Sequence, residues 1–140
     1  MAPTKKVILH YFDLGSKGCG EVVRLILREL RINFEDKRYA YNDTWAKLSK
    51  TYQEKGLSVA GKLPVLEMDG HILSQHIPLL RYLSRSAGNY DGSSSYDNWL
   101  ADAVSDIYVD WRAAMPETLK ALKKAISERP NVKEYIASRL

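Results

Sequence analysis

The sequence of 140 residues has a single cysteine and lacks long apolar runs. Because Cys19 has no partner in the chain for a disulfide, it indicates a reducing compartment, most simply the cytoplasm. No apolar stretch approaches the roughly 18 residues that suggest a membrane span. The short polar segment from Met1 to Lys6 predicts no secretory leader. We therefore expect a cytoplasmic protein that does not act at a membrane.

Several ligand classes also lack their sequence signatures. The 21 Lys and Arg residues are scattered among 17 Asp and Glu residues, so we expect no nucleic-acid partner. One cysteine and three scattered histidines offer no zinc-ligand spacing, and we expect no metal. The glycines of Gly15–Gly20 match neither a phosphate-binding nor a dinucleotide-binding loop, and there is no serine-hydrolase motif. The modest positive charge suits a small anionic ligand.

The apolar residues that are present indicate alternating strands and helices. The expected elements are a strand over 6–11, a helix over 21–32, a strand over 34–39, a helix from 43 or 44 to about 54, a hairpin over 63–73 and a helix over 75–86. Asp69-Gly70 between two apolar runs is a strong turn signal and marks the hairpin. Ser74 is expected to cap the helix that follows. This β-α-β-α-β-β-α order predicts an α/β thioredoxin-like domain.

A purely helical region follows this domain. Residues 87–95 are rich in glycine and serine and are expected to link the thioredoxin-like domain, 1–86, to a helical domain, 96–140. The helical domain has room for about three helices of average length. Pro116 is expected to start a new helix after a long first one, because proline fits best in a first turn. Asn131 is expected to cap a last short helix.

Several tracts of the sequence resemble soluble glutathione S-transferases. The matching tracts are Tyr11-Phe12 and residues 21–25, 61–70, 74–83, 102–112 and 128–135. The segment GKLPVLEMDG at 61–70 is the most specific of them. The resemblance is to fungal members with sigma-like features, and it implies a glutathione-binding domain. It also implies a truncated all-α domain, because several helices that relatives carry between residues 112 and 117 are absent.

The resemblance assigns residues to the backbone and the γ-glutamyl end of glutathione. The family's cis-proline, here Pro64, would turn the backbone of Leu63 toward the ligand, where it can pair like an added strand. The alternative is a proline that only begins a strand. Gln75 matches the contact to the γ-glutamyl carboxylate at a helix N-terminus. His76 replaces the usual serine and can still donate a hydrogen bond, or it can be an exposed helix-start histidine.

Other residues would bind the glycyl end and the amine. Trp45 matches a family position near the glycyl carboxylate, and Lys62 is the favoured cation there because the proline that follows sets its register. Lys47 and Lys50 are further candidates, or they form an ordinary solvated helix face. Asp110 matches an acid that binds the amine from the partner subunit in dimeric relatives, so we expect a homodimer. The alternative is a carboxylate on the surface of a helix.

The thiol needs a hydrogen-bond donor, because a free thiol with a pKa of ~8.5 is only a few per cent ionised at pH 7. Tyr11 is the first candidate by its position, although the stretch from Tyr11 to Arg24 is about two residues longer than in tyrosine-type relatives. The other interpretation of Tyr11 is a core aromatic residue. Ser16 is the alternative donor, as in serine-type relatives. Cys19 is a third candidate, since a helix N-terminus lowers the pKa of a thiol.

The expected function is glutathione-dependent chemistry on a small apolar electrophile. Conjugation, in which the thiolate adds to the electrophile, is the default that the resemblance implies. An alternative is glutathione-dependent cis-trans isomerisation of an unsaturated metabolite, in which the thiolate adds and then leaves. A third possibility of another class is a non-catalytic glutathione-binding or interaction module. It is motivated by the shortened helical domain, because helices of that domain build most of the electrophile pocket in relatives.

Overall fold

The computed structural model describes residues 6–128 and residue 130. The chain forms two compact units, Met1–Asp91 and Gly92–Leu140. The boundary between the two units falls inside the predicted linker, 87–95.

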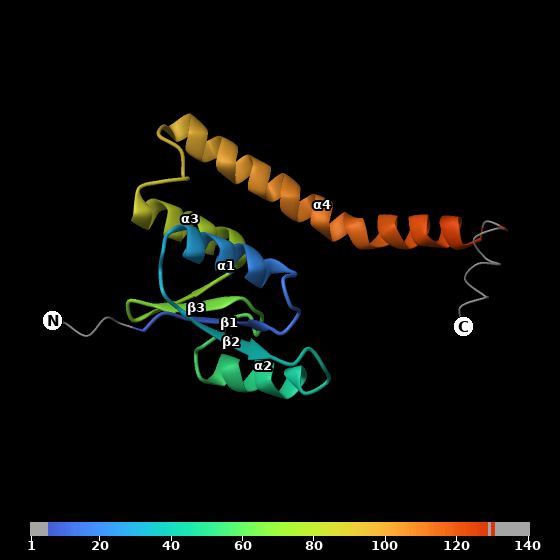
Figure 1. The fold of residues 1–140 in the computed structure, drawn as a ribbon, viewed down its shortest axis with the longest axis horizontal. Helices are drawn as coiled ribbons and strands as arrows, with labels where there is room; N and C mark the ends of the chain where they lie inside the picture. Colours follow the sequence, from blue (N-terminus) through green and yellow to red (C-terminus); the bar gives the residue numbers. More distant parts are fainter. Residues whose placement is uncertain (1–5, 129, 131–140) are drawn as a thin grey trace. The chain divides into compact units, whose positions relative to one another are not determined.

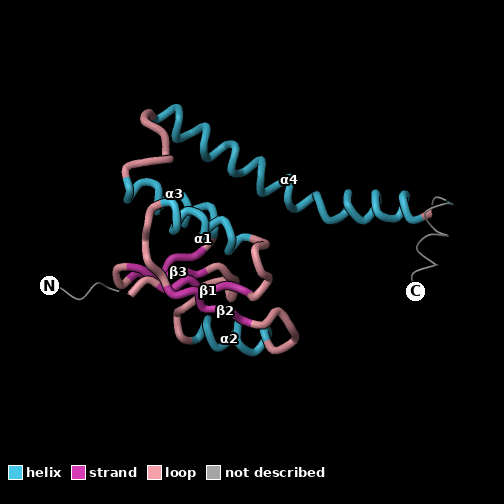
Figure 2. Tube along the Cα trace, in the orientation of Figure 1, coloured by secondary structure: helices cyan, strands magenta, loops and turns pink. Residues whose placement is uncertain are grey.

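The first unit is a mixed four-stranded sheet with helices on both faces (Figures 1 and 2). Its elements are β1 (Ile8–Phe12), α1 (Cys19–Glu29), β2 (Glu35–Tyr39), α2 (Trp45–Glu54), β3 (Val65–Met68), β4 (His71–Ser74) and α3 (His76–Ala87). In the strand order β2-β1-β3-β4, only β2 is parallel to β1, whereas β3 and β4 run antiparallel to their neighbours. Helices α1 and α3 cover one face and α2 covers the other (Figure 1). The predicted thioredoxin-like order is confirmed.

The core of the first unit lies between the sheet and helices α1 and α3. It consists of aliphatic side chains that are almost completely buried: Leu9, Val23, Leu27, Leu66, Leu79 and Leu83. Burial of each such side chain contributes about 1.5–3 kcal/mol of transfer free energy. Because side chains alternate along a strand, Leu9 and Tyr11 of β1 face this core, whereas His10 and Phe12 face α2.

Helix α2 is held in a different way, because none of its residues is buried. Its contacts to the sheet are aromatic. The ring of Trp45 meets Phe12 edge-on with 4.8 Å between centroids, and the ring of Tyr52 meets Tyr39 at 5.5 Å. The position of α2 therefore depends on a few rings instead of a buried apolar stripe.

The structure corrects the expected cap of α3. Ser74 does not cap α3, because β4 extends to Ser74 in order to pair with the start of β3. Gln75 takes the N-cap position, with no side-chain hydrogen bond to the helix. Thr44 takes the N-cap position of α2, but its hydroxyl donates to Asn42 Oδ1 at 2.6 Å and does not cap the helix.

The described part of the second unit is one helix, α4 (Ser95–Ser127). Its start is capped from both sides: the Asp97 carboxylate accepts from the backbone N–H groups of Ser93 and Ser94, and Ser94 Oγ accepts from the Asp97 N–H, each at 3.1 Å. Hydrogen bonds with Ser94 and Ser93 hold the pKa of Asp97 below its usual range. This stabilising contribution is present at neutral pH and is lost as the pH falls through the lowered pKa.

The prediction that Pro116 starts a new helix is wrong, because α4 continues through it. A proline removes one N–H donor, and the other backbone bonds of a long helix carry the element past it. The short helix expected at Asn131 lies outside the described residues. Within the ranges that the structure describes, no helix has the length and apolar character to cross a bilayer.

Candidate functional site

Segments that are distant in the sequence meet at one edge of the sheet. Val65, at the start of β3, lies beside His10 in β1 on one side and beside the end of β4 on the other. The end of β1, the start of β3 and the start of α3 are therefore neighbours. This arrangement brings Tyr11, the Leu63-Pro64 step and Gln75 to the same edge.

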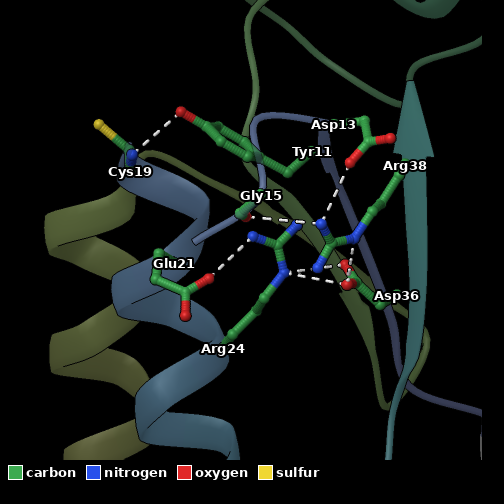
Figure 3. Close-up of polar contacts among 8 residues, drawn as sticks. All are labelled: Tyr11, Asp13, Gly15, Cys19, Glu21, Arg24, Asp36 and Arg38. Carbon is green, nitrogen blue, oxygen red and sulfur yellow. Dashed lines mark hydrogen bonds and ion pairs between the residues drawn. The ribbon is translucent and has the colours of Figure 1, made fainter. Parts of the chain in front are cut away.

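Tyr11 is almost completely inside the fold, with 5% of its surface exposed. Its hydroxyl oxygen accepts a hydrogen bond from the backbone N–H of Cys19 at 3.0 Å (Figure 3). Because this bond uses only the oxygen, the O–H proton is left to donate to a ligand. The start of α1 can approach the ring because it is rich in glycine: a Cβ atom at Gly20 would lie 2.2 Å from the ring, and one at Gly18 would lie 2.4 Å from the hydroxyl.

The other two candidates for the thiol partner lie in the β1–α1 loop and at its end. Ser16 is exposed in a bend of this loop. Cys19 is the first residue of α1 and is half-buried, and its backbone makes the bond to Tyr11. The functional group of Tyr11 is held by both packing and a hydrogen bond, whereas Ser16 is exposed in the loop.

A buried arginine organises the surroundings of Tyr11. Arg24 of α1 is 3% exposed, and its Nε donates to both carboxylate oxygens of Asp36 in β2 at 3.0 and 3.1 Å. Its Nη1 donates to Glu21 at 3.1 Å. Arg38 of β2 donates to Asp36 at 2.7 Å and to Asp13 in the β1–α1 loop at 3.2 Å (Figure 3). These charges join α1, β2 and the loop into one network.

The same guanidinium also contacts Tyr11 directly. Arg24 Cζ lies 5.8 Å from the centroid of the tyrosine ring. Its Nη2 is buried and makes no hydrogen bond to any described residue. A cation over the face of an aromatic ring is stabilised by the negative charge density of that face. Arg24 therefore holds the Tyr11 ring from one side while the start of α1 holds its hydroxyl.

The start of α3 has an unusual backbone. Gln75 has a φ of 70° and a ψ of 117°. Positive φ costs a residue with a side chain about 1–3 kcal/mol, and such residues cluster at binding and catalytic sites. His76 follows as the half-buried first residue of the helix. The unpaired backbone N–H groups of a first turn and the helix dipole suit an anion, as predicted for the γ-glutamyl carboxylate.

The Leu63-Pro64 peptide bond is cis, as the resemblance implies. Within the described part of the chain, the N–H and C=O groups of Leu63 make no hydrogen bond. Lys62, the residue before Leu63, is fixed by two hydrogen bonds. Ser58 Oγ accepts from the Lys62 N–H at 2.9 Å and donates to the Lys62 C=O at 2.7 Å. The backbone of Leu63 is therefore held in place and available for an extended ligand.

The residues predicted for the glycyl end lie on α2 and on the segment before β3. Trp45 is the first residue of α2 and is half-buried against Phe12, the neighbour of Tyr11 in β1. Lys47 and Lys50 on α2 are exposed, and so is Lys62. The structure thus places Trp45 near the sheet edge through its contact with β1.

Two further expectations concern Asp110 and metal ions. Asp110 lies exposed on α4, in the second unit, so its role at the amine of glutathione stays a prediction. Among the residues described, no group of three or more His, Cys, Asp and Glu side chains is arranged to hold a metal ion.

Sequence reasoning missed two buried polar residues. Arg24 lies on the helical stripe formed with Gly20, Val23 and Leu27, which are all buried. A charged residue at that spacing is a signal that could have been used. His10 is 1% exposed in the middle of an apolar strand, which is a similar signal. The local i,i+3 spacing points to Glu21 as a partner of Arg24, but the cross-strand partners, Asp36 for Arg24 and Glu67 and Tyr39 for His10, could not be identified from local sequence.

Comparison with known proteins decides the family. The family described as "Glutathione S-transferase, N-terminal domain" matches residues 8–85, more than half of the chain. The chain belongs to the glutathione S-transferase family. It is 36% identical over 104 residues to "Probable glutathione S-transferase 9" of Caenorhabditis elegans, covering 74% of this chain and 46% of that protein. It is 34% identical over 108 residues to "Hematopoietic prostaglandin D synthase" of Gallus gallus, covering 77% and 49%.

The fold is also similar to that of solved glutathione S-transferases. The crystal structure described as monomeric Na-GST-3 from Necator americanus matches with a TM-score of 0.67 and 27% identity, over 92% of this chain and 57% of that one. This glutathione S-transferase homologue spans about half the length of the curated relatives it matches.

We expect Arg24→Leu to lower the free energy of unfolding by about 3 kcal/mol, because it leaves Asp36 and Glu21 without their buried cation. Arg28→Leu is the matched control on the same helix. Arg28 is exposed and lies over the Phe34 ring at 5.9 Å, so its loss should cost less than about 1 kcal/mol. Urea unfolding measures both values. Equal losses for the two variants would contradict the assignment of Arg24 as the organising charge.

We expect Gln75→Gly to raise the free energy of unfolding by about 1 kcal/mol, because glycine adopts positive φ without strain. The same change should weaken glutathione binding by about tenfold through the loss of the predicted side-chain contact. Gln75→Ala removes that contact and keeps the strain, so it should bind as weakly without gaining stability. Thermal unfolding and calorimetric titration separate the two effects. A glycine variant that binds like the wild type would show that Gln75 has no contact with glutathione.

Proposed function

We propose that this chain binds glutathione at the sheet edge and activates its thiol for addition to a small apolar electrophile. The observation that carries the proposal is the Tyr11 hydroxyl, which is fixed by the Cys19 N–H and keeps its own proton to donate. A sulfur placed beside that hydroxyl would receive a hydrogen bond. Such a bond favours the thiolate over the thiol.

The energy involved is modest. Lowering the pKa of the thiol from ~8.5 to about 6.5 corresponds to about 2.7 kcal/mol and makes the thiolate the main species at neutral pH. The population of the reactive form then rises by about 30-fold at most, and the lower basicity of the sulfur reduces part of that gain. The remaining rate enhancement must come from holding the electrophile against the sulfur.

The rest of the proposed site matches the groups of glutathione one by one. The backbone of Leu63 pairs with the cysteinyl residue, and the first turn of α3 receives the γ-glutamyl carboxylate. The proposed glutathione-binding residues are Trp45, Lys50, Lys62, Leu63, Pro64, Gln75, His76 and Asp110. The unpaired Leu63 backbone and the positive φ of Gln75 support this arrangement. Each lowers the stability of the free protein, and binding energy from a ligand would offset that loss.

A second reaction has a specific observation in its favour. The relative from Gallus gallus is named a prostaglandin D synthase and not a transferase. We therefore keep glutathione-dependent isomerisation of an unsaturated metabolite as the alternative. Product analysis with a catalytic amount of glutathione distinguishes the two, because conjugation consumes glutathione stoichiometrically and isomerisation returns it. Binding without turnover on several electrophiles would instead favour the non-catalytic module.

We also propose a cytoplasmic homodimer. The single cysteine supports a reducing compartment.

The apolar side chains exposed on α4 support a partner surface; they include Trp99, Leu100, Val104, Ile107 and Trp111. In a dimer of this kind, Asp110 would reach the amine of glutathione in the partner's site. A stable monomer in sedimentation would contradict the dimer and the role of Asp110; Na-GST-3 is described as monomeric. The named relatives are animal proteins, so the fungal, sigma-like subdivision stays a prediction.

We expect Tyr11→Phe to lower turnover at neutral pH by about tenfold or more while the chain still retains glutathione, because the donor to the sulfur is lost. The pKa of the bound thiol, followed by its ultraviolet thiolate absorbance, should rise toward ~8.5. Ser16→Ala is the matched control, since it removes an exposed hydroxyl from the adjoining loop. If Ser16→Ala abolishes turnover and Tyr11→Phe does not, the serine is the donor and the assignment is reversed.

A further inference from the structure

A histidine is buried in the middle of the sheet with both ring nitrogens bonded. His10 in β1 is 1% exposed. Its Nε2 lies 2.6 Å from Glu67 Oε1 in β3, and its Nδ1 lies 2.6 Å from the Tyr39 hydroxyl in β2. The three side chains form a hydrogen-bonded chain across three adjacent strands, which we call the Glu67–His10–Tyr39 chain. The thiol chemistry proposed above does not use it.

The chemistry of the groups sets the direction of these hydrogen bonds. A carboxylate only accepts, so Nε2 of His10 carries the hydrogen and donates to Glu67. In the neutral imidazole Nδ1 is then an acceptor, and the Tyr39 hydroxyl donates to it. Burial, and to a smaller extent the Tyr52 hydroxyl, raise the pKa of Tyr39, so the Tyr39 hydroxyl keeps its proton. Both ring nitrogens of His10 are therefore satisfied, and the bond to Nδ1 orients the Tyr39 hydroxyl.

Tyr39 is also part of the aromatic contact that supports α2. Its ring is stacked on His10, with 5.9 Å between centroids and 10° between the planes. On the α2 side, Tyr39 meets Trp45 at 6.2 Å and Tyr52 at 5.5 Å. Since α2 has no buried residue of its own, these rings are a large part of what determines where its first residue, Trp45, lies.

We propose that the Glu67–His10–Tyr39 chain positions Trp45 for the glycyl end of glutathione. The inference rests on the proposed function, because Trp45 is taken to contact the ligand. The hydrogen bonds of the Glu67–His10–Tyr39 chain orient the Tyr39 side chain. The Tyr39 ring in turn contacts Trp45 and so positions the start of α2. Without the hydroxyl bond, the Tyr39 ring is held by ring packing alone, and the start of α2 is positioned less precisely. His10, Glu67 and Tyr39 are positioning residues that act through Trp45.

The test is calorimetric titration of the full chain with glutathione for wild type and Tyr39→Phe. The phenylalanine keeps the aromatic ring and removes the hydroxyl that bonds to His10 and lies beside the Tyr52 hydroxyl, so we expect Kd to rise roughly threefold to tenfold, the effect of about one hydrogen bond. Tyr90→Phe is the matched control. Tyr90 is 67% exposed and its hydroxyl donates to Glu29 at 2.8 Å, so the same change there should leave Kd as in the wild type.

A pair of Glu67 variants tests the other end of the Glu67–His10–Tyr39 chain. Glu67→Gln keeps an oxygen that accepts from His10 and should bind glutathione with a Kd near the wild-type value. Glu67→Leu removes the acceptor and should weaken binding to about the same extent as Tyr39→Phe, roughly threefold to tenfold. This pair also covers the case in which Tyr39→Phe fails to fold.

Calorimetry separates positioning from general stability. A merely structural role would reduce the fraction of active protein, and hence the apparent stoichiometry, while Kd of the folded fraction stays unchanged. If wild type binds glutathione and neither Tyr39→Phe nor Glu67→Leu changes Kd, this inference is wrong and the proposed function stands. If wild type does not bind glutathione, both are wrong.

Discussion

One buried charge, the guanidinium of Arg24, sets the geometry of the sheet edge. A cation in this position is stable only with carboxylates around it, so Asp36 in β2 and Glu21 in α1 must both reach it. Their pairing fixes the separation of helix and strand, and a second arginine extends the pairing into the loop between β1 and α1. Tyr11 lies inside this frame, between the guanidinium and the first N–H of α1. The proposed donor to the thiol is thus positioned by charge pairing as much as by apolar packing.

The two faces of the sheet support the proposed site in different ways. On the α1 and α3 face, an aliphatic core and the Arg24 network leave little room for movement around Tyr11. On the α2 face, no residue of the helix is buried, and its position depends on aromatic rings. The thiol end of glutathione would therefore meet a rigid surface, and the glycyl end a more adjustable one. All the proposed glutathione-binding residues except Asp110 lie in this first unit, whereas the electrophile pocket is expected to need the helical region as well.

Local signals in the sequence were sufficient for the order of elements. The Asp69-Gly70 turn and the strand and helix periodicities depend only on near neighbours, so the hairpin and the sheet edge could be predicted. Expectations failed where strand pairing or a long helix overrides a local preference. Ser74 pairs with β3 as part of β4 and does not cap α3, and α4 continues through Pro116. The partners of His10 in β2 and β3, and the Asp36 partner of Arg24 in β2, could not be predicted, because they come close only once the sheet has formed.

The central claim is that glutathione binds at the edge where β1 ends and β3 and α3 begin. Amide chemical shifts of the isotope-labelled full chain, followed by NMR during titration with glutathione, test it most directly. The account predicts that the largest shifts belong to the amides of Cys19, Leu63 and His76. The far end of the first unit, around Arg31 and Tyr90, should change little. Shifts concentrated at that far end, or no saturable shifts at all, would contradict the account.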